Sequence, residues 1–355
     1  MGIFEKLESL EDFNKRMDIV YNYGSNYVKA YPINIFLLTS KEKVTIFEDV
    51  HKFDLKFNAE IKEIQNNLFL LNYSRTWGDS TFSDYAYIFT NEKGWIVVID
   101  NYNTSPLEGL IKRLYPKVSP SYQSSDDMYC LMNWIIEKER NNDEFIADIY
   151  YMTAKKPGEQ TESIFKNVTM KQMKEKIERS FLIDKIKLML KQKDRVVFNG
   201  LISREGFCSF YNGDFSYFNK IIANYILESG MKKLDFCSDL IKNVHNEIIS
   251  QPIELHYEEE LTPNSLKQLS KDIQKIDNLS LSVIHEGNPM LLVHAIDIVD
   301  GSTFNITAIG KSIFLTPVLD TSGASLLKTG EHIARSFQEP IKWSYYGRDG
   351  NWENK

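Results

Sequence analysis

Residues 279–319 read LSLSVIHEGNPMLLVHAIDIVDGSTFNITAIGKSIFLTPVL, and this stretch decides the fold class of the chain. Its short runs of apolar and β-branched residues are separated by Gly, Pro, Asn and Asp, which is typical of antiparallel strands joined by tight turns. We predict four strands here, at 279–285, 290–299, 303–309 and 312–319, followed by a helix over 322–337.

The flanking sequence adds helices and further hairpins. Thr262 and Pro263 supply a cap residue and a proline at the first helical position, so a helix to Ile276 is expected. Asn91-Glu92-Lys93-Gly94 is a compact turn between two strand-like runs. Further strands are predicted at 67–73, 85–89, 95–99, 145–152, 195–202, 206–211 and 252–257, and helices up to about residue 50, at 106–114, from 125, and over 217–249 with a break at Gly230. The fold class is therefore predicted to be α+β, with antiparallel hairpins and sheets flanked by helices.

Length and composition indicate an ordered protein of two or three compact units. The chain has 355 residues, of which 43% are apolar and 26% charged, so it can bury sizeable cores. Cys130, Cys208 and Cys237 are scattered and form neither a disulfide framework nor a metal knuckle, which favours a reducing, cytoplasmic compartment. No apolar run reaches the roughly 20 residues that cross a bilayer, so no membrane partner is expected.

Positive charge is concentrated between residues 166 and 195. This segment has ten basic and four acidic side chains, a net +6 in a chain whose total is −7. Its apolar residues recur at three- and four-residue steps, as on a buried helical face: Met170, Met173, Ile177, Phe181, Ile186, Met189 and Leu190. We predict a long basic amphipathic helix here. It should connect an N-terminal unit (1–157), through a mostly helical middle unit (158–251), to a β-rich C-terminal unit (252–355).

Two groups of basic residues are candidates for contact with a partner. On the predicted helix they are Lys171, Lys174, Arg179, Lys185 and Lys187. Upstream, residues 111–122 interleave Lys112, Arg113 and Lys117 with Tyr115, a pattern of phosphate contact with base stacking. Charge runs are more often the solvated face of a helix, and lysines at a helix end suit the helix dipole. The aromatic residues of Trp343–Trp352 are a further candidate contact surface.

Sequence motifs exclude several large enzyme classes. The chain has no glycine-rich phosphate loop of the GxxxxGK[ST] or GxGxxG type, no GxSxG elbow and no kinase-like HRD or DFG set. Its six histidines include no HExxH pair. We therefore predict no cofactor, and the chain is expected to be non-catalytic.

Carboxylates provide the main alternative. Asp100 follows a predicted strand, while Asp297 and Asp300 flank the end of another, and metal-dependent phosphodiesterases draw such residues from distant strand ends. A hydrolase of this kind would hold Mg²⁺ or Mn²⁺. However, Asp300-Gly301 also suits a tight turn, and Asp100-Asn101 suits the entry to a loop.

Two strand–turn–helix segments have similar sequences, VVIDNYNTSPLEGL at 97–110 and PVLDTSGASLL at 317–327. An internal duplication would explain the similarity, although strand-to-helix junctions reuse the same cap chemistry without common ancestry.

Three functions follow from these observations. The first is a non-catalytic interaction subunit of a prokaryotic-type intracellular complex. It binds a protein partner, and a variant of this hypothesis adds nucleic-acid binding through the basic helix. The second is the metal-dependent phosphodiesterase or nuclease. The third is a small-ligand sensor with a cleft between its units. Because the chain is acidic outside residues 166–195, phosphate contact should be local.

Overall fold

The computed structural model describes residues 7, 9–19, 32–52, 54–99, 104–114, 117–139, 144–157, 159, 161–244, 247–318, 321–337 and 342–345. Within these ranges the predicted α+β fold class is confirmed, with antiparallel sheets and flanking helices. The chain forms two compact units. Unit 1 contains Met1–Ala154, Ser163–Glu178 and Ile183–Met231, and unit 2 contains Lys155–Glu162, Arg179–Leu182 and Lys232–Lys355.

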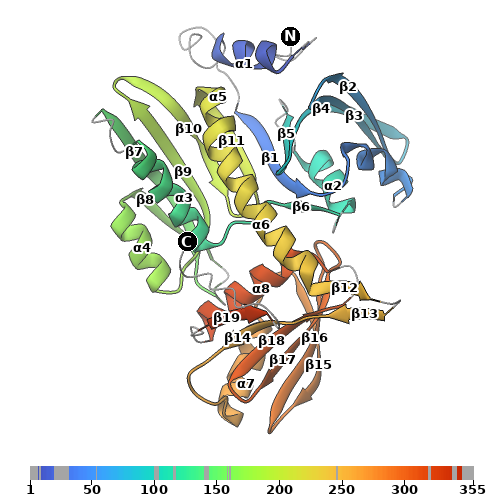
Figure 1. Cartoon of the computed structure of the whole chain (residues 1–355), viewed down its shortest axis with the longest axis vertical. Coiled ribbons are helices and arrows are strands. Elements are labelled where there is room, and N and C mark those ends of the chain that lie inside the picture. The colour runs from blue at the N-terminus through green and yellow to red at the C-terminus, as the bar shows by residue number, and fades with distance from the viewer. Residues whose placement is uncertain are drawn as a thin grey trace. The chain divides into compact units, whose positions relative to one another are not determined.

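One large sheet forms the frame of unit 1 (Figure 1). Its strands lie in the order β2-β3-β4-β5-β1-β11-β10-β9-β7-β8, and β6 pairs with β1 outside this order. The bounds are β1 Ile33–Ser40, β2 Phe57–Gln65, β3 Leu68–Trp77, β4 Ser80–Asn91, β5 Gly94–Ile99, β6 Val118–Pro120, β7 Phe145–Lys155, β8 Ser163–Val168, β9 Leu182–Gln192, β10 Arg195–Ser203 and β11 Phe207–Gly213. β1 is central and almost wholly buried, which its nearly continuous apolar sequence INIFLLTS explains.

The half of this sheet made by β2 to β5 packs against η2, a 3₁₀ helix at Val44–Lys52, and α2, at Ser105–Arg113. Phe47 of η2 lies 5.6 Å from the ring of Trp95 on β5, and Leu107 and Leu110 of α2 belong to the same buried cluster. Near the start of the chain, α1 (Leu10–Asp18) places Phe13 4.8 Å from both Phe89 and Phe215.

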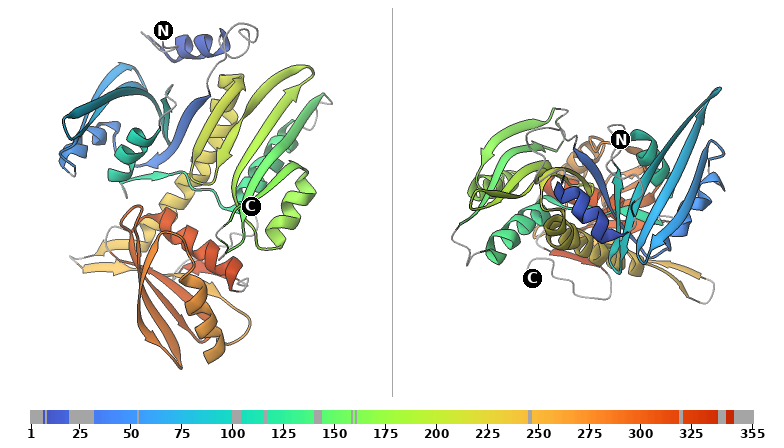
Figure 2. Two further views of the ribbon diagram at one scale, coloured as in Figure 1. Left: turned by 180° about the vertical axis from the view of Figure 1, so that it is seen from behind. Right: turned by 90° about the horizontal axis from the view of Figure 1, so that it is seen from above.

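The other half, β7 and β9 to β11, packs against α3 (Ser125–Lys138) and α6 (Asn224–Leu240), with α4 (Met170–Glu178) beside α3. A short helix, α5 (Phe215–Tyr217), and a π-helical turn, η3 (Phe218–Ala223), lead into α6. Phe198 of β10 stacks on Phe218 at 5.5 Å, and Trp134 of α3 lies 4.9 Å from Tyr225 of α6. Seen from behind, β9 to β11 lie in front of these helices (Figure 2, left).

Unit 2 has a smaller sheet, in the order β15-β16-β17-β18-β14-β19. Its strands are β14 Ile253–His256, β15 Leu279–Glu286, β16 Met290–Asp297, β17 Thr303–Ile309, β18 Ser312–Pro317 and β19 Lys342–Tyr345, and β12 (Ile241–Val244) pairs separately with β13 (Glu247–Ser250). α7 (Pro263–Ile273) and α8 (Gly323–Ser336) cover one face, where Leu255, Val293, Ile306 and Leu315 are fully buried. The four strands and two helices predicted over 263–337 are confirmed.

The same topology occurs in both units. In unit 1 the elements run β1-η2-β2-β3-β4-β5-α2, with β1 antiparallel to β5. In unit 2 they run β14-α7-β15-β16-β17-β18-α8, with β14 antiparallel to β18. The two similar sequence segments occupy equivalent places, from β5 into α2 and from β18 into α8. The likeness of the two segments thus coincides with an equivalent order of strands in the two sheets.

The predicted long basic helix is wrong. Helix α4 ends at Glu178, Ser180 has a left-handed φ of 62°, and strand β9 begins at Leu182. Over residues 186–191 of β9 the buried Ile186, Leu188 and Leu190 alternate with the partly exposed Lys187, Met189 and Lys191, as in a half-buried strand. Helical spacing over 168–191 was thus a chance overlap of two shorter patterns.

Other expectations also need correction. The opening segment is not wholly helical, because β1 precedes η2. Gly230 does not interrupt α6, which continues to Leu240, and a hairpin replaces the predicted helix over 241–250. Residues 183–213, expected in a separate middle unit, continue the sheet of unit 1.

Candidate functional site

Strand β9 places alternate residues on two different faces of the sheet. Ile186 and Leu188 lie opposite Ile202 and Gly200 on the face that the helices cover. Lys185, Lys187 and Met189 lie opposite Ser203, Leu201 and Asn199 on the other face. In the part of the chain that the structure describes, no helix of unit 1 covers the β9–β10 portion of this second face (Figure 2, left).

Two tyrosine rings lie near a lysine of this second face, and a third tyrosine bonds to an asparagine of the same face. The Nζ of Lys187 lies 5.1 Å from the ring centroid of Tyr151 on β7 and 5.7 Å from that of Tyr211 on β11. These distances are within the range of a cation–π contact. The hydroxyl of Tyr150 donates to Oδ1 of Asn199 at 3.1 Å, and the pKa of Tyr150 is raised by burial and then by Tyr211. We call Tyr150, Tyr151, Lys185, Lys187, Lys191, Asn199 and Tyr211 the Tyr–Lys face.

The charge of the Tyr–Lys face is positive. Alternation along β9 places Lys185, Lys187 and Lys191 on it, and the residues opposite them on β10 are uncharged. Asp184 Oδ2 lies 3.1 Å from Lys185 Nζ and offsets part of its charge. Among the described residues no carboxylate lies within ion-pair distance of Lys187, whose Nζ contacts two tyrosine rings. All members of the face are half-exposed, so a ligand can reach them.

On the side toward β1, the polar residues of the same face are not accessible to a ligand. Ser203, Ser209 and Asn34 are buried, and Ser209 Oγ donates to Asn34 Oδ1 at 3.2 Å. The binding area is consequently limited to the portion near β7, β9 and the outer end of β11.

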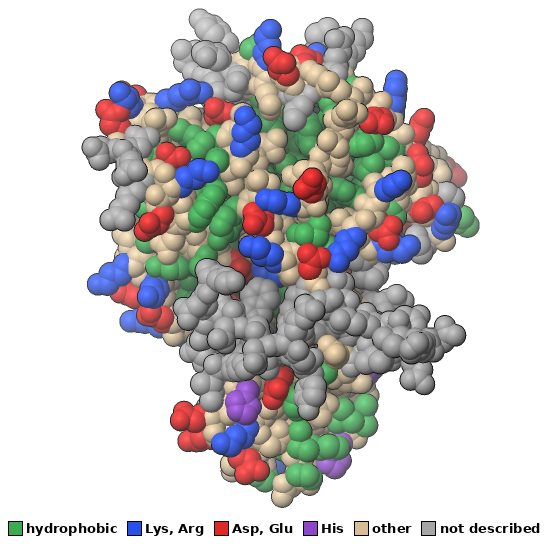
Figure 3. Space-filling view, in the orientation of Figure 1, with side chains coloured by type: hydrophobic (Ala, Val, Ile, Leu, Met, Phe, Trp, Pro, Cys, Tyr) green, Lys and Arg blue, Asp and Glu red, His purple; other side chains and the backbone are tan. Residues whose placement is uncertain are grey.

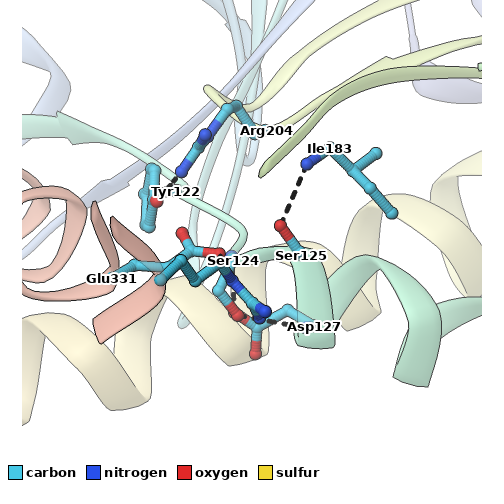
Figure 4. A network of polar contacts seen from close by, with 8 residues as sticks. Tyr122, Ser124, Ser125, Asp127, Ile183, Arg204 and Glu331 are labelled. Carbon is cyan, nitrogen blue, oxygen red and sulfur yellow. Dashed lines mark hydrogen bonds and ion pairs between the residues drawn. The ribbon is translucent and has the colours of Figure 1, made fainter. Parts of the chain in front are cut away.

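A hydrogen-bonded network fixes the start of β9 and the end of β10 (Figure 4). Ser124 and Asp127 form a capping box at the start of α3, and the backbone N–H of Ile183 donates to Ser125 Oγ at 3.0 Å. Arg204 Nη2 donates to the hydroxyl of Tyr122, while the Arg204 N–H donates to the carbonyl of Asp184 at 2.9 Å. These bonds fix the start of β9 relative to α3 and so position Lys185 and Lys187.

The basic residues predicted from sequence do not form one surface. Lys171 and Lys174 are exposed on α4, in the helical layer on the opposite side of the sheet from the Tyr–Lys face. Lys176 Nζ, also on α4, lies 4.3 Å from the ring of Phe165. Arg179 is exposed after the end of α4. On the helical side of unit 1, basic and acidic side chains are intermixed (Figure 3).

The second predicted basic group is neutralised in part. Lys112 Nζ lies 2.7 Å from Glu108 Oε1 on the same helix, and Arg113 Nη2 lies 3.2 Å from Asp54 Oδ2. Lys117 is exposed, and Tyr115 lies outside the described residues. This group remains a prediction, with two of its three cations in ion pairs.

Two of the three candidate carboxylates have roles in the start of α8. Asp297 is buried and accepts hydrogen bonds from the Val299 N–H and from Ser325 Oγ, both at 2.9 Å. Asp300 accepts from the Ser302 N–H at 2.8 Å and from Ser322 Oγ. Burial raises the pKa of Asp297 above its usual value. Asp100 lies outside the described residues, and within them no group of three or more His, Cys, Asp or Glu could hold a metal.

Tyr150, Tyr151, Asn199 and Tyr211 were missed by sequence reasoning, although Lys185 and Lys187 were named. The available signal was the alternation in residues 186–191, IKLMLK, which identifies one strand face as lysine-bearing. The tyrosines come from strands distant in sequence, so only the strand order brings them to that face.

Neither a family model nor a curated protein matches this chain. None of the described helices combines the length and the apolar character that a bilayer-spanning segment requires.

Proposed function

We propose that this chain is a non-catalytic binding subunit that holds an anionic macromolecular partner on the Tyr–Lys face of unit 1. The observation that carries this proposal is Lys187, a half-exposed cation between Tyr151 and Tyr211, in a strand that presents two more lysines on the same side. Lysine supplies charge and tyrosine supplies contact area at low cost in side-chain entropy, which is a combination suited to binding.

The distribution of charge supports an anionic partner. The whole chain has a net charge of −7, so a lysine-bearing strip stands out against an acidic background. An anionic ligand would be repelled elsewhere and attracted locally, which favours one defined contact over general adhesion. A protein partner would offer an acidic segment, and nucleic acid would offer phosphates.

The use of the carboxylates also supports binding over hydrolysis. Asp297 and Asp300 hold the turn after β16 and the start of α8 through backbone and serine donors. These hydrogen bonds account for the placement of both carboxylates by a structural role, without a metal ion.

Two double variants with the same charge change test this proposal. Lys185→Glu/Lys187→Glu reverses the charge of two lysines of the Tyr–Lys face. Lys171→Glu/Lys174→Glu reverses the charge of two exposed lysines on α4. The native partner is recovered by crosslinking and co-purification. The amount recovered should fall by about tenfold with the first pair of substitutions and by less than about twofold with the second. Equal recovery with both pairs would contradict the proposal. Thermal unfolding of each variant must match the unmodified chain, so that lost binding is not lost folding.

A further inference from the structure

We infer that the ligand of the Tyr–Lys face is a single strand of nucleic acid; this inference rests on the proposed function and specifies its partner. Three features of the face support a single strand: a row of lysines, aromatic rings beside this row, and the small width of the strip that holds both.

The lysine row matches a chain of regularly spaced anions. Lys185, Lys187 and Lys191 lie on one side of β9, so successive positions on that side are separated by roughly 6.6 Å along the strand. Met189 takes the remaining position, opposite Asn199. An extended ligand parallel to β9 therefore meets one cation after another, which is how grooves for single strands track a phosphate backbone.

The rings supply the second component, a surface for stacking. Tyr151 lies on β7 and Tyr211 on β11, so the aromatic positions flank the lysine row on both sides. Lys187 Nζ lies over both rings, and its long side chain can move to a phosphate and leave the ring faces to bases. Tyr150 is held by Asn199, which fixes its ring at the edge of the same area.

Other anionic ligands, such as an acidic peptide or a nucleic-acid duplex, would contact fewer of these features. An acidic peptide would form ion pairs with the lysines, but its carboxylates would not stack on the tyrosine rings. A duplex presents a wide anionic surface with its bases stacked inside, and a chain of net charge −7 offers it only one narrow basic strip. A single strand exposes both phosphates and bases, so it fits the whole arrangement.

The test is fluorescence anisotropy with the full chain and three labelled probes. These are a deoxythymidine oligonucleotide of about 12 nucleotides, a duplex of about 12 base pairs, and a polyglutamate peptide of similar charge. The variants are Tyr211→Leu and Tyr151→Leu, which keep the charge, and Lys187→Gln; Lys174→Gln on α4 is the matched control. Circular dichroism melting of each variant checks folding.

The oligonucleotide should bind more tightly than the other probes, and its affinity should fall with rising salt. Each tyrosine variant should weaken it by about tenfold, as expected for the loss of one stacked base. Lys187→Gln should weaken it and flatten the salt dependence, while Lys174→Gln should leave both unchanged. Tighter binding of polyglutamate or of the duplex, or oligonucleotide binding insensitive to the tyrosines, would overturn the single-strand inference while leaving the proposed function standing. Absence of binding to all three probes would overturn this inference, and the partner-recovery experiment would then decide the proposed function separately.

Discussion

Asp297 shows what a buried carboxylate does in this fold. It lies at the end of β16, and its two oxygens accept from the Val299 N–H and from Ser325 Oγ, so it links a turn to the first turn of α8. The cost is desolvation, which burial imposes on the charged form and which raises the pKa of this carboxyl. A residue chosen from sequence as a metal ligand is, in the structure, a support for a helix start.

Replacement of Asp297 by asparagine should change how stability depends on pH. Because the pKa of the folded state lies above the unfolded value of 3.8, the folded protein binds the proton more tightly. The contribution of Asp297 to the free energy of unfolding is therefore greatest below the unfolded pKa and declines as the pH rises through the folded pKa. Asp297→Asn removes this decline. We expect the difference in unfolding free energy between variant and parent to be more favourable to the variant at pH 7 than at pH 4, measured by urea unfolding.

Ser325→Ala is the control for this prediction. It removes the hydroxyl partner, whose hydrogen bond lowers the pKa of Asp297, and keeps the carboxylate. It should lower stability by about 1–2 kcal/mol at pH 7 and keep the decline of stability with rising pH that Asp297→Asn removes. A stability difference for Asp297→Asn that is the same at both pH values would show that desolvation of Asp297 is unimportant.

At the scale of elements, the sequence predicts those segments whose local pattern is unambiguous. Strands β15 to β18 and helices α7 and α8 were predicted because turn residues and caps bound each apolar run. The region 166–195 was not, because the apolar residues of a short helix and those of an alternating strand together mimic one long helix. The Tyr–Lys face depends on this distinction. In a helix, Lys185 and Lys187 would not share a side, whereas in β9 they do.

Capping at the start of α3 gives a prediction at this scale. Ser124 accepts from the Asp127 N–H at 3.1 Å, and Asp127 accepts from the Ser124 N–H at 2.7 Å. Ser124→Ala should therefore lower the free energy of unfolding by about 1 kcal/mol. Thr104, the N-cap of α2, makes no side-chain cap hydrogen bond, so Thr104→Ala should change it by less than about 0.5 kcal/mol. Equal effects of the two changes, measured by denaturant unfolding, would contradict this account of the caps.

At the scale of the whole molecule, the chain uses one topology twice and adds to it in unit 1. The strand order of β1 to β5 recurs in β14 to β18, and in unit 1 the second edge of β1 pairs with β11 and so extends the sheet. The binding face that we propose lies in that extension. Sequence comparison within the chain could suggest the repeat, but the extension depends on pairing between β1 and β11, which are far apart in sequence and carry no mutual signal.

The central claim is that a ligand binds unit 1 on the Tyr–Lys face and not on the helical side. Lysine acetylation by a water-soluble reagent, read by mass spectrometry with and without the deoxythymidine oligonucleotide, tests this claim most directly. We predict that the ligand protects Lys185, Lys187 and Lys191 on β9, and that Lys171 and Lys174 on α4 react equally in both samples. Protection of Lys171 and Lys174 with unchanged reactivity of Lys187 would contradict it.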